Sequence, residues 1–96
     1  MRGVVLLTVR PGKEEGYRAA HRSVWPELVA AAREAGIRNH SCFMTGRTVV
    51  AYFEADDLEA ASERMARHPV KQRWNAFMEE FLEPGAITLE EVFHMD

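Results

Sequence analysis

The chain has 96 residues, of which 47% are hydrophobic and 28% are charged, and its formal net charge is −3. This length corresponds to one domain near the lower size limit for a self-sufficient hydrophobic core, so we expect a partner subunit. The acidic balance argues against nucleic acid as a ligand, because phosphate backbones are bound by basic patches. Cys42 is the only cysteine, which excludes an intrachain disulfide and a four-thiolate metal site and favours a reducing compartment.

The first expected element is a strand. Residues 3–10 are rich in Val and Leu, and Pro11-Gly12 follows as a turn signal. The apolar run 4–9 is too short to cross a membrane and lacks the cleavage pattern of a signal peptide. We therefore expect a cytoplasmic protein that is not bound to a membrane.

A long helix is predicted over residues 13–35, with Gly36 as its end. Pro26 lies inside it, and a proline there removes a backbone hydrogen bond and clashes with the preceding turn. We therefore expect a kink or a new start near residues 23–25. One face of the predicted helix carries the stripe Tyr17, His21, Val24, Trp25, Leu28 and Ala32.

Two strands, residues 37–44 and 48–54, predict a hairpin that turns at Thr45-Gly46-Arg47. Asp56 or Asp57 is then expected to cap a short helix.

A further helix and a last strand are expected in the remainder of the chain. Pro69 begins the helix at its first position. Its inward stripe consists of Val70, Trp74, Phe77, Met78 and Phe81. After a turn at Pro84-Gly85, residues 88–95 predict the strand. One side of this strand carries Leu89, Glu91, Phe93 and Met95.

The order β-α-β-β-α-β is that of the ferredoxin-like α+β fold, in which helices cover one face of an antiparallel sheet. We expect it to form a single domain over residues 1–96. The other sheet face would remain in water, yet the first and third strands carry aliphatic residues on both sides. A second copy stacked face to face would bury them, so a homodimer with a barrel-like interior is predicted.

Tyr17, His21 and Trp25 recur four residues apart, which places a phenol, an imidazole and an indole on one helix face. Histidine exchanges protons near neutral pH, a hydroxyl can hold a substrate oxygen, and a flat apolar ring can cover the C–H face of a sugar. This combination predicts a small polyol site. The alternative is that the three rings are ordinary half-buried core residues.

These residues belong to a longer pattern that resembles a known family. Tyr17-x3-His21-x3-Trp25-Pro26-Glu27-Leu28 is followed by Asn39, by Gln72-Arg73-Trp74 with Met78, and by Glu91-Val92-Phe93. In order and spacing, this pattern is similar to the L-rhamnose mutarotase family. The resemblance implies a dimeric α/β barrel without a cofactor that interconverts the α and β anomers of a deoxyhexose. It also implies that His21 is the proton donor and that Tyr17 and Trp74 contact the sugar.

Two positions depart from the pattern of familiar L-rhamnose mutarotases. His40 stands where they have a tyrosine, and Asn75 stands where they have a second tryptophan. The resemblance implies that both positions bind substrate, so His40 and Asn75 are carried over as locations without a role. An imidazole loses the reach of a phenol, and an amide replaces a stacking ring. L-Fucose or another 6-deoxyhexose is therefore an alternative to L-rhamnose as the substrate.

Mutarotation suits these residues because it needs neither a nucleophile nor a metal. The ring oxygen gains a proton while the anomeric hydroxyl loses one, and the ring then closes on the other face of the aldehyde. A histidine can serve in both directions at neutral pH, so His21 is expected to be catalytic. Glu91 could orient His21 or share its proton, or it could form a structural ion pair at the dimer interface. Trp25 is a candidate for supporting the site without touching the sugar.

Other functions have less support in the sequence. His40 and Cys42 alternate onto one strand face, but two ligands without a spaced second pair do not define a metal site, so no metal is predicted. A cofactor-free monooxygenase or a haem-handling dimeric barrel would share the predicted shape, and a non-catalytic binding or dimerisation module is a third alternative. Convergent polar groups beside a tryptophan favour a sugar, whereas a drier pocket would favour the oxygenase.

Overall fold

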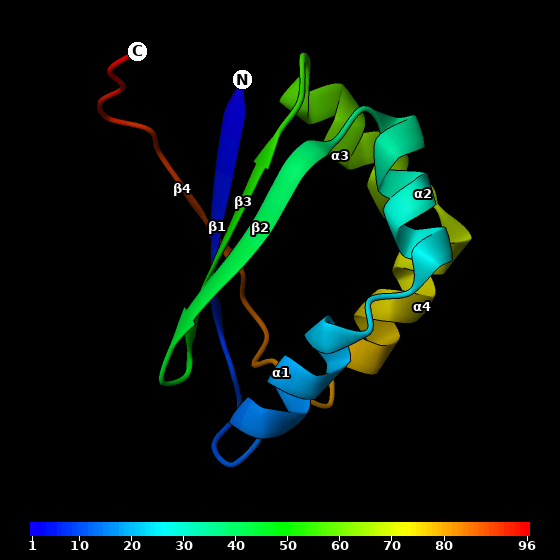
Figure 1. The fold of residues 1–96 in the computed structure, drawn as a ribbon, viewed down its shortest axis with the longest axis vertical. Helices are drawn as coiled ribbons and strands as arrows, with labels where there is room; N and C mark the ends of the chain where they lie inside the picture. The colour runs from blue at the N-terminus through cyan, green and yellow to red at the C-terminus, as the bar shows by residue number, and fades with distance from the viewer.

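The computed structural model describes all 96 residues and shows a four-stranded antiparallel sheet with its helices on one side (Figure 1). The strands lie in the order β2-β3-β1-β4, which confirms the predicted ferredoxin-like α+β arrangement. No helix is long and apolar enough to cross a membrane. The elements in chain order are β1 (Arg2–Thr8), α1 (Glu14–Arg22), α2 (Pro26–Ala35), β2 (Arg38–Thr45), β3 (Thr48–Glu54), α3 (Leu58–Arg67), α4 (Pro69–Met78) and β4 (Ile87–Leu89).

The first helical connection starts anew at Pro26, which confirms the predicted break. α1 ends at Arg22, and the backbone N–H of Ser23 donates to the carbonyl of Ala20. Pro26 is the first residue of α2, a position where its missing N–H would have no helical partner. Gly36 ends α2 with a φ of 99°, a left-handed conformation that glycine adopts without strain.

The second helical connection is set by two side-chain caps. Of the two candidate aspartates, Asp57 is the cap of α3, where its carboxylate accepts a hydrogen bond from the backbone N–H of Ala60 at 3.0 Å. His68 caps α4 by accepting from the backbone N–H of Val70 at 3.2 Å. Pro69 is the first residue of α4, as predicted.

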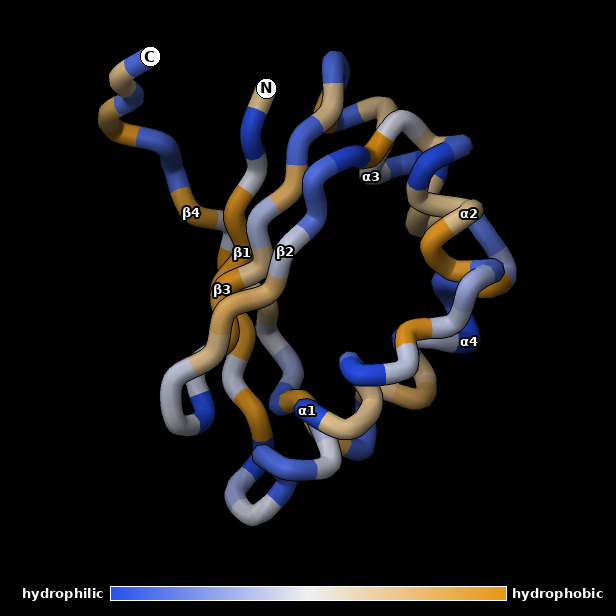
Figure 2. The backbone as a smooth tube through the Cα atoms, in the orientation of Figure 1, coloured by the Kyte–Doolittle hydropathy of each residue, from blue (hydrophilic) through white to orange (hydrophobic).

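The hydrophobic core lies between the helices and one face of the sheet. In the antiparallel pair β1 and β3, Leu7 is the partner of Val49 and Val5 is the partner of Ala51. Val49 is fully buried, and Leu7 packs against the same core. The tube coloured by hydropathy shows β1 and β3 as mainly hydrophobic along their middle (Figure 2).

The opposite face of the sheet has no helix over it (Figure 1). Because side chains alternate along a strand, the neighbours of the core residues point to this side. Three of the residues there are large and apolar, namely Phe43, Ile87 and Leu89, which are 62%, 55% and 41% exposed. Leu89 also lines a hollow of about 320 Å³ between β1, β3 and the C-terminal segment. We call this side the open face.

The last strand is shorter than the sequence pattern predicts. β4 covers only Ile87–Leu89, paired with Val4–Leu6 of β1, whereas the pattern predicts a strand over residues 88–95. The apolar side chains that follow find no core within the chain, and Val92, Phe93 and Met95 are all exposed. Residues 90–96 therefore continue without regular pairing, and hydrophilic and hydrophobic residues are mixed along this segment (Figure 2).

Candidate active site

Tyr17 and His21 of α1 lie beside Trp74 of α4, on the side of the sheet that the helices cover. The rings of Tyr17 and His21 stack with centroids 4.1 Å apart and planes at 29°. Trp74 meets His21 edge-on, with centroids 5.4 Å apart and planes at 81°. Tyr17 and Trp74 are buried, at 4% and 6% exposure, whereas His21 is only half-buried. The fold thus joins the three residues into one cluster in which the imidazole keeps solvent access.

A hydrogen bond to the backbone orients the His21 ring. Its Nδ1 lies 2.8 Å from the carbonyl oxygen of Tyr17, one turn earlier in α1. Since a carbonyl oxygen only accepts, Nδ1 must carry the hydrogen, and Nε2 is the nitrogen that can gain or lose a proton. His21 therefore presents one defined nitrogen for acid–base chemistry.

Trp25 lies behind this cluster and does not continue the face of α1. The predicted stripe through Trp25 assumes one helix, but Trp25 precedes the first residue of α2. Its ring meets Trp74 edge-on at 5.0 Å and stacks on Phe77 at 5.8 Å. Aromatic pairs of this kind contribute about 0.5–1.5 kcal/mol each beyond the burial of their area. Trp25 therefore holds Trp74 in place against His21.

The helix-facing side of β2 contributes His40 and Cys42. Cys42 is the partner of Ala51, which is buried beneath the helices, and His40 lies two residues earlier on the same side. Both residues keep access to solvent, because β2 is the edge strand of the sheet, although the elements packed around them remove part of their hydration. Solvent therefore reaches the edge of the helix-facing side at β2.

A β-bulge at Asn39 sets the direction of His40. The register of β2 against β3 shifts at this point, and Asn39 has a φ of 51°, a left-handed conformation that asparagine tolerates. Its side-chain Nδ2 donates to Oε1 of Glu54 at 2.8 Å, which holds the bulge. The ring of His40 then meets Phe53 edge-on at 5.8 Å. Bulges often re-aim a side chain next to a functional site.

The hydroxyl of Tyr17 on α1 lies next to the thiol of Cys42 on β2. Burial, with a smaller contribution from this thiol, raises the pKa of Tyr17 well above its usual range. Burial also raises the pKa of Cys42. Both groups therefore keep their protons at neutral pH. Tyr17 can donate or accept a hydrogen bond but is not a base, and Cys42 is not an activated nucleophile.

Lys71 of α4 is a member of this cluster that the sequence pattern did not indicate. It is half-buried, one turn before Trp74, and its titratable neighbours are His40 and Cys42 of β2. Burial lowers the pKa of Lys71. Burial also lowers the pKa of His40, and the charges of Lys71 and His21 lower it further, so His40 is neutral at pH 7. The spacing Lys71-x2-Trp74, which places both residues on one helix face, is the signal that could have identified Lys71.

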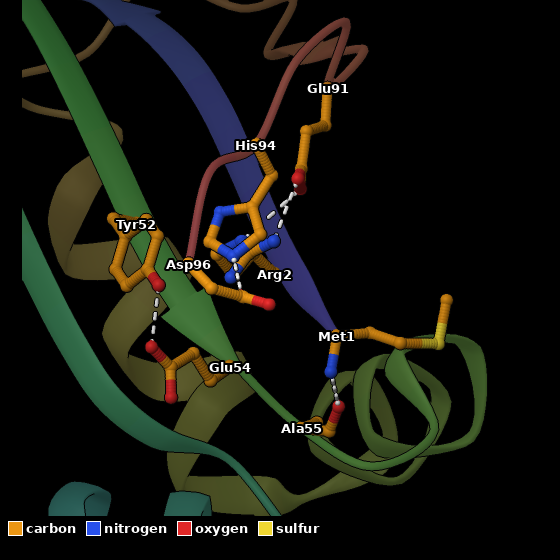
Figure 3. A network of polar contacts seen from close by, with 8 residues as sticks. All are labelled: Met1, Arg2, Tyr52, Glu54, Ala55, Glu91, His94 and Asp96. Atoms are coloured by element: carbon orange, nitrogen blue, oxygen red, sulfur yellow. Dashed lines mark hydrogen bonds and ion pairs between the residues drawn. The ribbon is translucent and has the colours of Figure 1, made fainter.

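Two predicted site residues lie apart from the cluster. Asn75 follows Trp74 in α4 and is exposed. Glu91 accepts hydrogen bonds from Nε and Nη2 of Arg2 at 3.2 and 2.8 Å, and Arg2 holds the pKa of Glu91 below its usual range. Figure 3 shows this pair next to Tyr52, which lines the hollow of the open face. Because β4 stops at Leu89, Glu91 is not on a strand face, and within this chain its partner is Arg2 and not His21.

Comparison with known proteins places this site in a family. The sequence model described as L-rhamnose mutarotase matches residues 2–95. An L-rhamnose mutarotase from Oceanobacillus iheyensis is 35% identical over 99 residues, covering 95% of this chain and 94% of that protein. Another from Sinorhizobium fredii is 35% identical over 98 residues, covering 93% and 92%. The crystal structure of an L-rhamnose mutarotase from Formosa agariphila superimposes with a TM-score of 0.84 at 26% identity, covering 100% of this chain and 99% of that one.

The fold is shared more widely than the family. Tetracenomycin F2 cyclase from Streptomyces glaucescens, a type-II polyketide cyclase, superimposes with a TM-score of 0.74 at 24% identity, covering 100% of this chain and 97% of that one. A likeness at this identity shows the fold alone. The match over nearly the whole chain and the two relatives at 35% identity are more specific. The chain belongs to the L-rhamnose mutarotase family.

Proposed function

We propose that the chain is a mutarotase, an isomerase that interconverts the α and β anomers of L-rhamnose without a cofactor. Its relatives of the same length bear this name. The structural observation that carries the proposal is the orientation of His21, which stands beside Tyr17 and Trp74 with Nε2 available for proton exchange. L-Fucose is the alternative substrate, because His40 and Asn75 depart from the familiar pattern.

Ring opening needs an acid and a base at two neighbouring oxygens of the sugar. Protonated His21 gives the Nε2 proton to the ring oxygen as the bond between that oxygen and the anomeric carbon breaks. The anomeric hydroxyl gives its proton to a base, which leaves an aldehyde. We assign the base to His40, a neutral imidazole on the strand that faces α1.

Ring closure runs through the same groups in reverse. Rotation about the bond between the first two carbons presents the other face of the aldehyde. The hydroxyl formed from the ring oxygen attacks the carbonyl carbon and returns its proton to Nε2 of His21, while His40 returns its proton to the carbonyl oxygen. Both histidines regain their first state, so the cycle consumes nothing. Each positioned acid or base contributes about 10²–10⁴-fold to the rate.

Tyr17, Trp74 and Asn75 are assigned to sugar binding. The protonated hydroxyl of Tyr17 can donate to or accept from a sugar hydroxyl. Trp74 offers an apolar ring next to His21, and the face of such a ring suits the C–H groups of a pyranose. Asn75 lies apart from the ring cluster, so its assignment rests on the family pattern, in which this position binds substrate; its amide can donate to a sugar oxygen.

A homodimer is proposed to form through the open face. Phe43, Ile87 and Leu89 are exposed there, and the exposed Phe93 lines the same hollow as Leu89. Burial of one large apolar side chain contributes about 1.5–3 kcal/mol, so two copies related by a twofold axis would be stabilised by covering each other's open face. This arrangement gives the residues that follow β4 the apolar partner that a single chain lacks.

The cytoplasm is the proposed location. Cys42 is an exposed free thiol, and a reducing compartment keeps such a thiol unpaired.

The proposal is tested by saturation-transfer NMR of anomeric exchange in equilibrated L-rhamnose and L-fucose, with and without the protein. This measurement is needed because anomers also interconvert spontaneously. Protein-dependent exchange of L-rhamnose supports the proposal, and exchange of L-fucose alone replaces the substrate but keeps the reaction. Acceleration of neither sugar, in protein that elutes as a folded species, would contradict the mutarotase function.

A further inference from the structure

The chain has two lysines, and only one of them forms an ion pair. Lys13 is exposed, and its Nζ lies 3.7 Å from a carboxylate oxygen of Glu80. Lys71 is half-buried, and it takes part in none of the eight ion pairs of the chain. Lys71 is therefore a cation that the protein has partly removed from water without giving it an anion.

The surroundings of Lys71 supply no carboxylate. It lies in the first turn of α4, on the helix face that carries Trp74. Its titratable neighbours are His40 and Cys42 of β2. The first turn of a helix is the positive end of its dipole, where a cation is disfavoured. Helix α4 has no acidic residue in its first turn that would offset this.

A partly buried ammonium without an anion destabilises the protein. No contact of Lys71 within the chain compensates for this cost. Partial burial of an ammonium without an anion destabilises the charged form, which is why the pKa of Lys71 is lowered. The charge of Lys71 also acts on His40, one of the two histidines assigned to proton transfer, and lowers its pKa. No carboxylate is among the groups that interact with Lys71, so its ammonium is available to an anionic ligand.

We propose that Lys71 recognises the carboxylate of a sugar acid, so that the mutarotase site takes hexuronates. This inference rests on the proposed function, because it concerns the substrate of the same His21 site. L-Rhamnose carries a methyl group at C6, and the hexuronate of the same configuration, L-mannuronate, carries a carboxylate there. A neutral hexose would leave the ammonium with hydroxyl partners alone, whereas the acid supplies the missing anion. The chemistry at the anomeric carbon is unchanged.

A carboxylate fits better than a phosphate. A phosphate monoester presents three acceptor oxygens and close to two negative charges, and it is commonly bound by several cations or by a series of backbone N–H groups. Lys71 is a single ammonium, and Pro69 removes one of the first N–H groups of α4. His68 already occupies the N–H of Val70. The single ammonium of Lys71 therefore suits a ligand with one carboxylate better than a phosphate monoester.

The experiment compares L-mannuronate with L-rhamnose, which share the ring configuration and differ at C6. Protein-dependent anomeric exchange and the concentration for half-maximal effect are measured for each sugar in the unmodified protein, in Lys71→Met and in Lys71→Arg. Lys13→Met is the matched control, since it removes the other lysine. We expect the unmodified protein and Lys13→Met to bind the acid about tenfold or more tightly than L-rhamnose. Lys71→Met should abolish this preference, and Lys71→Arg should keep most of it.

The outcomes separate this inference from the proposed function. Exchange of L-rhamnose with no preference for the acid, or a preference that survives in Lys71→Met, would overturn the role of Lys71 and leave the mutarotase function standing. Exchange of neither sugar would overturn both. A preference that depends on Lys71 and weakens as salt is added supports a charge pair, because salt screens such pairs. Folding of each variant is checked by its melting temperature, which Lys71→Met should leave unchanged or raise.

Discussion

The two faces of the sheet are built from alternate residues of the same strands, yet they differ in almost every property. On the helix-facing side, Tyr17, His21 and Trp74 are packed ring against ring. On the open face, Phe43 and Leu89 lie exposed with no element over them. Glu54 and Glu91 form their hydrogen bonds at the open face, with Asn39, Tyr52 and Arg2 as partners.

The difference shows that the helix-facing side is packed within one chain, whereas the open face is left uncovered. Four helices are enough to hold the imidazole of His21 in one orientation, because the hydrogen bond to Tyr17 and the edge of Trp74 come from the same chain. The open face has no such cover, and it has apolar side chains where a face that stays in water would have polar ones. Catalysis is therefore expected to depend on one face and association on the other.

The largest expected effect is on catalysis, from His21→Ala. Loss of the Nε2 proton donor should lower the protein-dependent exchange rate about 10²–10⁴-fold, as measured by saturation-transfer NMR. The fold should persist, because His21 is only half-buried. The control is His94→Ala in the exposed C-terminal segment, which should keep the rate. Full activity of His21→Ala would assign the proton transfer to another group.

The next effect concerns association through the open face. Phe43→Glu combined with Leu89→Glu places two charges where apolar contacts are proposed, so the dimer should dissociate to the 10.9 kDa monomer. Each lost apolar contact is worth about 1.5–3 kcal/mol. Sedimentation equilibrium distinguishes the two states, with Ser62→Glu on the exposed surface of α3 as the control. An unmodified protein that already sediments as a monomer would show that the open face has another use.

A smaller effect is expected in the pH dependence of the rate. The titratable groups that act on His40 are Lys71 on α4 and His21 on α1. A neutral His40 is needed as the base, so the rate falls as the pH drops through the pKa of His40, which burial, Lys71 and His21 lower.

Lys71→Met removes one of these causes, and it should therefore raise the pKa of His40 and move the acidic limb of the rate profile to higher pH. The profile is measured from the NMR exchange rates across the acidic range, with Lys13→Met as the control. An acidic limb that stays in place in Lys71→Met but disappears in His40→Gln would keep His40 as the base and remove the influence of Lys71. A limb that persists in His40→Gln would remove His40 from the mechanism.

The smallest effect is expected from Glu91→Gln. Its ion pair with Arg2 is solvent-exposed, and exposed pairs contribute little to stability. The melting temperature and the exchange rate should therefore stay close to those of the unmodified protein. A marked loss of exchange would mean that Glu91 reaches a site in the assembled protein and that the separation of the two faces is incomplete. Arg18→Gln, which removes another exposed partner of a carboxylate, is the matched control.

Most elements of the fold could be predicted because their signals are local. Pro26 interrupts a helix wherever it stands inside one, and Asp57 caps a helix through its own side chain, so neither depends on distant residues. The end of β4 could not be predicted in this way. Its apolar alternation is correct for a strand, but a strand also needs a paired neighbour and a face to bury, and the chain supplies both only as far as Leu89.

The candidate site divides along the same line. The spacing of Tyr17 and His21 predicted that they share a helix face, and the structure shows that their rings also stack. The sequence did not indicate Lys71 as a site residue, because most lysines are solvent-exposed charges. Only the fold places Lys71 next to His40 and Cys42 of β2. A bulge at Asn39 sets the direction of His40.

By itself, then, the sequence determined the order of the elements, the helix break and the family pattern around His21, since each follows from short-range periodicity, capping or spacing. Only the tertiary structure decided on which side of the sheet each polar side chain lies. Glu91 could be assigned to Arg2, and Lys71 to the site, only once the register of the strands was known, because a shift of one residue exchanges the two faces.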